Sequence, residues 1–285
     1  MGFVLGCAID RSGTGPSDQP GGDASLDAPV EDAPLDDRTA PPADALSDRS
    51  PDADAAPPPS PCPVLSGIDV LALYSFDEEP DTDRAVDQTG LHPAALRNGS
   101  FPERLGPSRE ECGQAFQFDG QAYLEIADTP DWDLEEGAID FWFLPPDMSE
   151  GRQAAIVSRD ANGIRQPGHL TVFYLSNGRI EARLQREAND QRLTSAALPD
   201  QWTHVGVSFG PQGFRLFING VLVASNPVFT FGIDGNANPW TIGASQSQSS
   251  EGEANSLFGF PPSGAIDHFR VQRLEDDFRQ IRLVD

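Results

Sequence analysis

The stretch from residue 201 to residue 225, QWTHVGVSFGPQGFRLFINGVLVAS, restricts the possible fold most strongly. Apolar side chains occupy every second position at 205–209 and again at 214–218. Such alternation is typical of strands with one buried face. Asn219-Gly220 follows the second run, and this pair predicts a tight type I′ hairpin, because both central residues of that turn need positive φ. The stretch therefore predicts three consecutive antiparallel strands.

Runs of the same kind continue on both sides of this stretch. We expect further strands at 71–77, 94–98, 114–118, 121–126, 139–143, 154–159, 170–175, 179–185, 192–198, 240–243 and 264–273, and a terminal helix at 274–283. Asp119-Gly120 and Asn177-Gly178 predict two more hairpins. Roughly a dozen short strands with turn signals between them predict an all-β, two-sheet antiparallel sandwich.

The N-terminal part of the chain has a different composition. No aromatic residue occurs between Phe3 and Tyr74, and residues 8–63 contain twelve acidic residues, three Arg and twelve Pro. A segment this poor in apolar side chains cannot offset the entropy lost on ordering. We therefore expect residues 8–63 to be a disordered linker, and residues 64–285 to form one large β domain.

The residues before the linker, 1–7, end in Val4-Leu5-Gly6-Cys7, which resembles a bacterial lipobox, where a peptidase cleaves before the Cys and lipid is attached to it. A complete signal needs a charged start and more apolar residues, so either the protein begins upstream of Met1 or the match is accidental. A lipidated Cys7 followed by an extended acidic linker predicts a bacterial surface lipoprotein whose linker holds the domain away from the membrane. The chain contains no apolar run long enough for a transmembrane helix.

The formal net charge is −26, and all basic residues are Arg. Nucleic-acid binding depends on clustered basic side chains that neutralise phosphates. The acidic composition therefore argues against nucleic acid as a partner and agrees with a protein outside the cell or with cation binding.

The chain has three Cys, at positions 7, 62 and 112, and their spacing matches no metal site. In an exported protein, Cys62 and Cys112 can form a disulfide that closes a loop of about 50 residues and stabilises the fold by roughly 4 kcal/mol on the chain-entropy model. The alternative is two unpaired, buried thiols.

Four segments also resemble, in order, the laminin-G-like, concanavalin A-like jelly-roll family. They are L-Y-S-F-D at 73–77, Q-F-D-G-x-x-Y-L-E-I at 117–126, the hairpin stretch at 205–224, and G-A-I-D-H-F-R-V at 264–271. The resemblance covers about residues 67–283 and implies a jelly-roll sandwich. In related domains the first and last strands lie close together and can share a structural Ca²⁺.

Asp77 and Asp267 match the two positions of that calcium site, so the resemblance implies Ca²⁺ between them. By parity, Asp267 shares the apolar face of the last strand with Phe269 and Val271. A carboxylate there must be hydrogen-bonded, paired or metal-bound. It is expected either to bind Ca²⁺, with backbone carbonyls as most of the other ligands, or to accept hydrogen bonds from backbone N–H groups or an Arg. A second acidic turn, at 234–236, is better explained as a tight turn than as a cation site.

Three side chains are candidates for ligand binding, namely Trp142, Tyr174 and Arg183. By parity they lie opposite the more apolar sets of their strands. Exposed aromatic rings stack on sugars, and Arg hydrogen-bonds to hydroxyl groups. The alternative is that the second sheet or a loop covers them. The loop at 245–263, with the apolar run Leu257-Phe258-Gly259-Phe260, either tucks under the sandwich or contacts a partner.

Concanavalin A-like folds also include glycosidases, whose strand of alternating acids puts nucleophile and acid on one face. The nearest stretch here is Asp131-Trp132-Asp133-Leu134-Glu135, which precedes a Gly and the 139–143 strand and so departs from that pattern. It is better explained as a solvated acidic loop, and no catalytic residue is assigned.

Taken with the fold analogy, the sequence predicts a non-catalytic, lectin-like domain on a bacterial cell surface or outer membrane that recognises glycans or surface proteins. The alternatives are a concanavalin A-like glycoside hydrolase or lyase, and a structural adhesive spacer.

Overall fold

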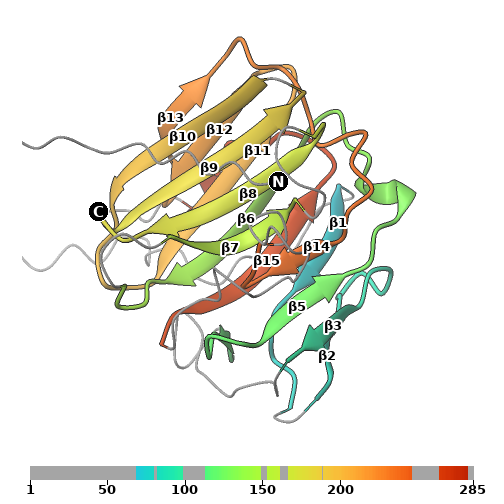
Figure 1. The fold of residues 1–285 in the computed structure, drawn as a ribbon, viewed down its shortest axis with the longest axis vertical. Helices are drawn as coiled ribbons and strands as arrows, with labels where there is room; N and C mark the ends of the chain where they lie inside the picture. The colour runs from blue at the N-terminus through green and yellow to red at the C-terminus, as the bar shows by residue number, and fades with distance from the viewer. Residues whose placement is uncertain are drawn as a thin grey trace, which may run out of the picture. The chain divides into compact units, whose positions relative to one another are not determined.

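The computed structural model describes residues 69–79, 82–98, 113–148, 153–160, 166–187, 189–245 and 263–281. The expectations for Cys7, for the 8–63 linker and for a Cys62–Cys112 disulfide lie outside these residues, as does almost all of the 245–263 loop. Within the described ranges, fifteen strands form two antiparallel sheets (Figure 1). The predicted all-β sandwich is confirmed.

The first sheet has the order β1-β15-β6-β11-β12-β13, and β4 also pairs with β15. Its strands are β1 (Val70–Tyr74), β4 (Phe116–Gln117), β6 (Gly137–Leu144), β11 (Thr203–Phe209), β12 (Phe214–Ile218), β13 (Val221–Asn226) and β15 (Ala265–Gln272).

The second sheet has the order β10-β9-β8-β7-β14-β5-β3-β2. Its strands are β2 (Arg84–Ala85), β3 (Ala94–Arg97), β5 (Tyr123–Ile126), β7 (Gln153–Arg159), β8 (His169–Leu175), β9 (Arg179–Arg186), β10 (Asn189–Ala197) and β14 (Trp240–Ile242). Two short 3₁₀ turns, η1 (Pro130–Trp132) and η2 (Arg279–Ile281), complete the described elements.

The core lies between the two sheets, and alternation along the strands decides which side chains enter it. On β6 the residues Ile139, Phe141 and Phe143 are fully buried in this core. On β9 the residues Ile180 and Leu184 face it from the other sheet. Period-two patterning therefore places one set of each strand's side chains in a shared apolar layer.

The stretch at 201–225 folds as its sequence predicts. Strands β11, β12 and β13 pair antiparallel in chain order. Between β12 and β13, Asn219 and Gly220 have φ angles of 49° and 69°, as a type I′ turn requires. The Asn177-Gly178 hairpin between β8 and β9 is also confirmed.

The hairpin predicted at Asp119-Gly120 is wrong. Strand β4 pairs with β15 in the first sheet, whereas β5 pairs with β14 and β3 in the second. The Asp119 carboxylate accepts hydrogen bonds from the backbone N–H groups of Gln121 and Ala122 at 2.8 and 2.6 Å. Asp side chains stabilise many kinds of turn in this way, and here the turn carries the chain from one sheet to the other.

The terminal helix predicted at 274–283 is replaced, within the described residues, by an irregular segment that ends in η2. This segment packs on the outer face of the first sheet. Phe278 is fully buried there, and a Cβ atom placed on Gly206 of β11 would lie 2.5 Å from its ring. Gly206 therefore provides the space that lets the segment dock.

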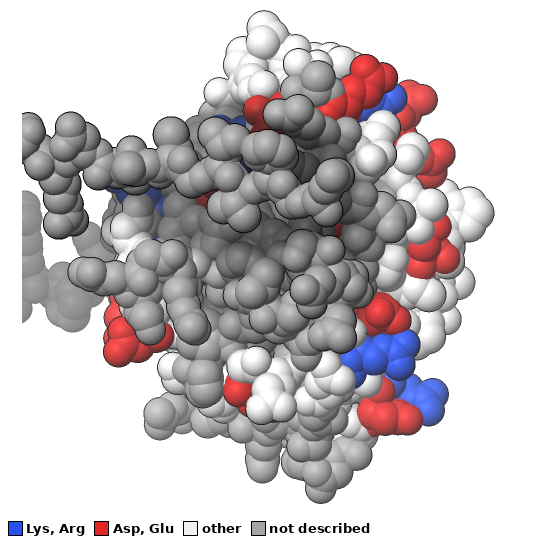
Figure 2. Space-filling model, in the orientation of Figure 1, with Lys and Arg blue, Asp and Glu red and all other residues white. Residues whose placement is uncertain are grey.

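Acidic side chains are spread over the described surface in Figure 2, with few basic ones beside them. Among the residues that the structure describes, no helix has the length and apolar character needed to cross a membrane.

Candidate functional site

The environment of Asp267 differs from the prediction in one respect. Asp267 lies directly opposite Trp142 on β6, and the register then shifts before Arg270 meets Asp140. The shift is a β-bulge at His268, whose φ is 50°. Because opposite residues share a face, Asp267 lies on the outer face of the sheet with Trp142. Its expected placement with Phe269 on the core face is therefore wrong, because a bulge breaks the period of two.

Asp267 is nevertheless fully buried. Its Oδ1 atom accepts a hydrogen bond from the His268 backbone N–H at 2.7 Å and lies 2.9 Å from His268 Nδ1. Its Oδ2 atom is buried with no hydrogen-bond partner in the described structure. Burial raises the pKa of Asp267 to about 6, against the opposing effect of His268, and the negative charge of Asp77 adds a smaller increase.

Asp77 follows β1, and its carboxylate is close enough to Asp267 for their repulsion to raise the pKa of Asp267. Its Oδ1 atom accepts a hydrogen bond from the Gln114 N–H at 2.8 Å, and a Cβ atom on Gly113 would overlap it. A buried, unpartnered carboxylate oxygen beside a second carboxylate has the charge and donor type that Ca²⁺ prefers. The described residues contain no group of three His, Cys, Asp or Glu suited to a metal, so backbone carbonyls would have to complete such a site.

Trp142 does not face solvent, so the expectation of an exposed stacking platform is wrong for this residue. Its side chain is only 2% exposed and belongs to a small outer cluster with Ala138, Phe217 and Phe278. The cluster forms because the segment after β15 lies over this face. The sequence left this covering open as an alternative, and the apolar side chain of Phe278, in the segment after β15, is part of it.

Arg183 does lie on the outer face of the second sheet, but its guanidinium group is already paired. Its Nε and Nη2 atoms bond to the two carboxylate oxygens of Asp190 on β10, at 2.9 and 2.8 Å. Burial alone would raise the pKa of Asp190, but hydrogen bonds from Arg183 and Arg192 outweigh it and hold the pKa below its ordinary value. In the described structure, the guanidinium group of Arg183 is therefore engaged in an ion pair with Asp190.

Tyr174 also differs from its predicted placement, because its ring belongs to the core cluster with Leu170 and Val172 of the same strand. It is 7% exposed and packs edge-on against Phe143 of the opposite sheet, with ring centroids 5.3 Å apart. The ring therefore lies between the two sheets, near their rim, rather than on an outer surface.

A cavity of about 350 Å³ opens at this rim, and we call it the Tyr174 cavity. Its described lining residues are Pro145, Pro146, Asp147, Tyr174, Leu198 and Asp200. Tyr174, one of the three predicted ligand-binding side chains, therefore lines a cavity. Trp142 and Arg183 are not among its described lining residues.

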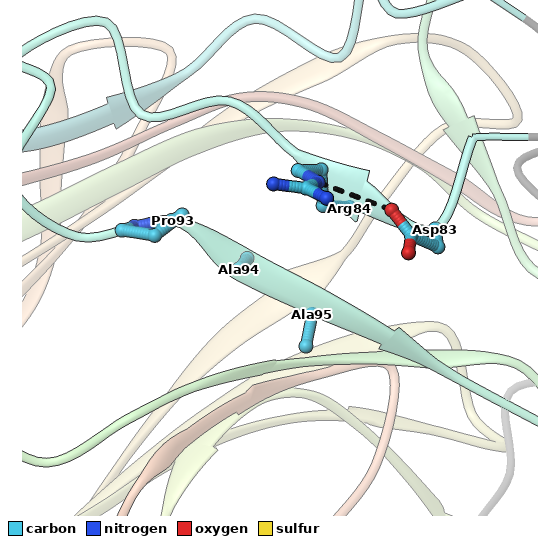
Figure 3. A pocket seen from close by; sticks show the side chains of 5 residues that line it. All are labelled: Asp83, Arg84, Pro93, Ala94 and Ala95. Carbon is cyan, nitrogen blue, oxygen red and sulfur yellow. Dashed lines mark hydrogen bonds and ion pairs between the residues drawn. The ribbon is translucent and has the colours of Figure 1, made fainter.

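A second hollow, of about 240 Å³, lies on β2 and β3 (Figure 3). Pro93, Ala94 and Ala95 line it beside two charged residues. Arg84 Nε and Asp83 Oδ1 are 3.1 Å apart, so these two groups neutralise each other. The hollow thus offers short apolar side chains and a charge pair that is already formed.

The acidic stretch considered for glycoside hydrolysis lies on η1 and the loop that precedes β6, not along a strand. Asp133 Oδ1 accepts a hydrogen bond from the Gly235 N–H at 2.6 Å. Asp131 lies 3.4 Å from Arg273 and 3.5 Å from His92, and Glu135 is exposed. Asp131 and Asp133 therefore hold loops together, and none of the three acids lies on a strand. In the turn at 234–236, the carboxylate of Asp234 pairs with Arg186 at 2.7 Å.

A buried ion network on the outer face of the first sheet was not predicted from the sequence. Arg270 Nε donates to Asp140 Oδ1 at 2.7 Å, and His204 Nε2 lies 2.9 Å from Asp140 Oδ2. Burial alone would raise the pKa of Asp140, but Arg270 and His204 outweigh it, so the pKa is lowered. In the sequence, Asp140, His204 and Arg270 are polar residues on the strand faces opposite to the apolar sets. They are buried because the segment after β15, which contains Phe278, covers this face.

Asp87 is a second side chain that the sequence did not single out. Its carboxylate accepts hydrogen bonds from the backbone N–H groups of Leu73, Thr89, Leu91 and His92, at 2.9 to 3.1 Å. It therefore ties the loop after β2 to β1, and its oxygens are engaged in holding the fold.

The comparisons with known proteins agree with this architecture. Residues 118–274, more than half of the chain, match the family model of the concanavalin A-like lectin/glucanases superfamily. The chain belongs to that superfamily. No curated protein matches it.

Similar solved structures share the fold at low sequence identity. Domain 4 of AbnA, an extracellular GH43 arabinanase from Geobacillus stearothermophilus solved with arabinotriose, has a TM-score of 0.54 and 18% identity, over 76% of this chain and 98% of that domain. The binding domain of botulinum neurotoxin DC, solved with rat synaptotagmin II, has a TM-score of 0.52 and 16% identity, over 75% and 50% of the chains. The binding domain of Paraclostridial Mosquitocidal Protein 1 has a TM-score of 0.55 and 14% identity, over 75% and 51%. The chain thus spans about half of each toxin domain.

Proposed function

We propose that the protein is a non-catalytic recognition domain that binds glycans, or proteins, at a bacterial cell surface. The observation that carries the proposal is the Tyr174 cavity, a concave site at the rim of the sandwich. Ligand sites are typically concave, largely apolar and supplied with a few polar groups. The Tyr174 cavity is concave, and it places two carboxylates and a phenol beside proline and leucine side chains, so it is a more polar site than most.

The similar solved structures support this class of function. The arabinanase domain was solved with arabinotriose and the neurotoxin domain with synaptotagmin, so the fold supports binding of both sugars and proteins. The rival function is hydrolysis or cleavage of a polysaccharide, since the superfamily also includes glucanases. The loop positions of Asp133 and Glu135 favour binding, because retaining hydrolysis needs two carboxyl groups about 5 Å apart on either side of the bond that is cleaved.

A glycan array probed with the full-length protein tests the proposal, with product release from polysaccharides measured in parallel. We expect binding without turnover. Turnover that Asp133→Asn and Glu135→Gln abolish would establish the enzyme instead. Absence of glycan binding, together with a protein partner in pull-down experiments, would support the adhesive alternative.

The attachment to the cell also belongs to this proposal. Lipidation of Cys7 would anchor the protein, the acidic residues 8–63 would act as the spacer, and a Cys62–Cys112 disulfide would form after export. Palmitate labelling of the protein, expressed from its own gene in a bacterial host, tests the anchor. Labelling should disappear in Cys7→Ala. Mass spectrometry of the unreduced protein tests the disulfide.

We propose in addition that Asp77 and Asp267 hold a structural Ca²⁺, which would neutralise the buried Asp267 carboxylate. The unpartnered Oδ2 atom of Asp267 supports this proposal. Calcium should raise the melting temperature of the wild-type protein, EDTA should reverse the effect, and Asp267→Ala should abolish it. A melting temperature that is the same with calcium and with EDTA would refute the metal site.

A further inference from the structure

The Tyr174 cavity is formed by three connections that are far apart in the sequence. Pro145-Pro146 follows β6 in the first sheet, Tyr174 lies near the end of β8 in the second, and the 198–200 segment follows β10. The Leu198 N–H donates to the Gly178 carbonyl at 2.7 Å, which fixes the 198–200 segment to the β8–β9 turn. Two prolines restrict the third wall. The cavity is therefore largely preformed.

The polar groups of the cavity have no partners in the described structure. Tyr174 is more than nine-tenths buried, and none of the described residues forms a hydrogen bond with its hydroxyl group. The carboxylates of Asp147 and Asp200 likewise form no ion pair or hydrogen bond with any described group. This contrasts with Asp83 in the hollow on β2 and β3, which is paired with Arg84.

Both carboxylates lie within electrostatic range of the phenol. Burial raises the pKa of Tyr174, and the charges of Asp200 and Asp147 raise it further. The cavity thus combines an aromatic ring and proline and leucine side chains with two negative charges and no described positive one. Such a site favours an occupant with an apolar face and a positive charge.

We infer that the Tyr174 cavity binds an amino sugar with a free ammonium group, such as a glucosamine unit. The C–H face of the pyranose ring would pack on Tyr174 and the prolines. The ammonium group would lie between Asp147 and Asp200, and ring hydroxyls would bond to the phenol. This inference rests on the proposed recognition function and gives that site its ligand class.

A neutral sugar complements the charge of the Tyr174 cavity less well than an amino sugar does. Hydroxyl groups can donate to carboxylates, but they bring no positive charge to balance the negative charges of Asp147 and Asp200. A hydroxyl group that donates to a carboxylate also forms a charge-assisted hydrogen bond, but only an ammonium group adds the Coulomb attraction between opposite full charges. The acidic surface would also attract a cationic glycan over longer distances, at low ionic strength above all.

Isothermal titration of the full-length protein with glucosamine tetramer and with N-acetylglucosamine tetramer tests the inference. Acetylation removes the charge and keeps the ring, so we expect the acetylated tetramer to bind about tenfold more weakly or worse. Asp147→Asn and Asp200→Asn should each weaken glucosamine binding about tenfold and leave the melting temperature unchanged. Asp83→Asn, at the opposite edge of the second sheet, is the matched control and should bind as wild type.

Tyr174→Phe removes the hydroxyl group and keeps the buried ring, so it separates ligand binding from folding. We expect a loss of about threefold to tenfold in affinity, as for one neutral hydrogen bond. Tyr174→Ala is unsuitable, because losing a core ring destabilises the sandwich.

The possible failures distinguish the inference from the function on which it rests. Equal affinity for the two tetramers, or binding that both Asn variants leave unchanged, overturns the amino-sugar site while the recognition function stands. Binding of a lysine-rich peptide, but not of glucosamine, that Asp147→Asn weakens overturns the sugar as occupant. Absence of binding to both tetramers and to every glycan on the array overturns the inference together with glycan recognition.

Discussion

Replacing Asp267 with Asn tests the electrostatics of the bulge in β15. Burial raises the pKa of Asp267 to about 6 in the folded protein, whereas an unfolded Asp titrates near 3.9. Between these two values the folded state holds the proton more tightly than the unfolded state does. In metal-free buffer, the favourable contribution of the protonated carboxyl group is therefore fully present below about pH 4 and is lost as the pH rises past 6.

The size of this loss follows from the shift of about two pKa units. At 1.36 kcal/mol per unit, the ionised carboxylate costs at most roughly 3 kcal/mol at pH 7. Asn cannot ionise, and its amide oxygen can still accept the hydrogen bond from the His268 N–H. As the pH rises from 4 to 7, we therefore expect the free energy of unfolding of Asp267→Asn to increase by about 2–3 kcal/mol relative to that of wild type. For a domain of this size, this corresponds to roughly 4–12 °C in melting temperature.

Urea denaturation in EDTA, repeated from pH 4 to pH 7.5, measures this difference, and Asp83→Asn serves as a control because its carboxylate is exposed. Only the difference between variant and wild type is informative, since many carboxylates titrate in this range. Parallel stability profiles for wild type and Asp267→Asn would refute the reasoning. Added calcium should stabilise wild type and leave the variant unchanged.

Three further substitutions test other parts of the fold. Gly206→Ala puts a methyl group within 2.5 Å of the Phe278 ring, so we expect it to cost about 1–3 kcal/mol in urea denaturation. Most of that cost should disappear in a Phe278→Ala background, and strictly additive losses would contradict the contact. Asp140→Ala leaves the buried Arg270 with only a longer, 3.9 Å contact to Asp276 and should cost about 3–5 kcal/mol; a loss under about 1 kcal/mol would show that the pair is dispensable. Asp87→Asn turns an acceptor of several backbone N–H groups into a partial donor and should cost at least about 2 kcal/mol, and an unchanged thermal melt would argue against this role.

The candidate site was only partly predictable, because its residues are brought together over long sequence distances. Tyr174 was selected as an aromatic side chain expected on the exposed face of its strand, but it lies between the sheets, and the sequence did not reveal that residues 145–147 and 198–200 lie beside it. Asp77 and Asp267 were selected through the family resemblance. Their proximity depends on the pairing of the first strand with the last, which no local pattern encodes.

By itself, the sequence determined most of the strands, the two-layer sandwich and the hairpin at Asn219-Gly220. These features follow from short-range physics, namely the two-residue period of a half-buried strand and the positive φ that a type I′ turn requires. The tertiary structure alone decided on which face Asp267 lies, because one bulged residue at His268 reverses the parity of a strand. It also decided that Trp142 is buried, since burial depends on which distant segment docks, and here the chain after β15 places Phe278 over that face.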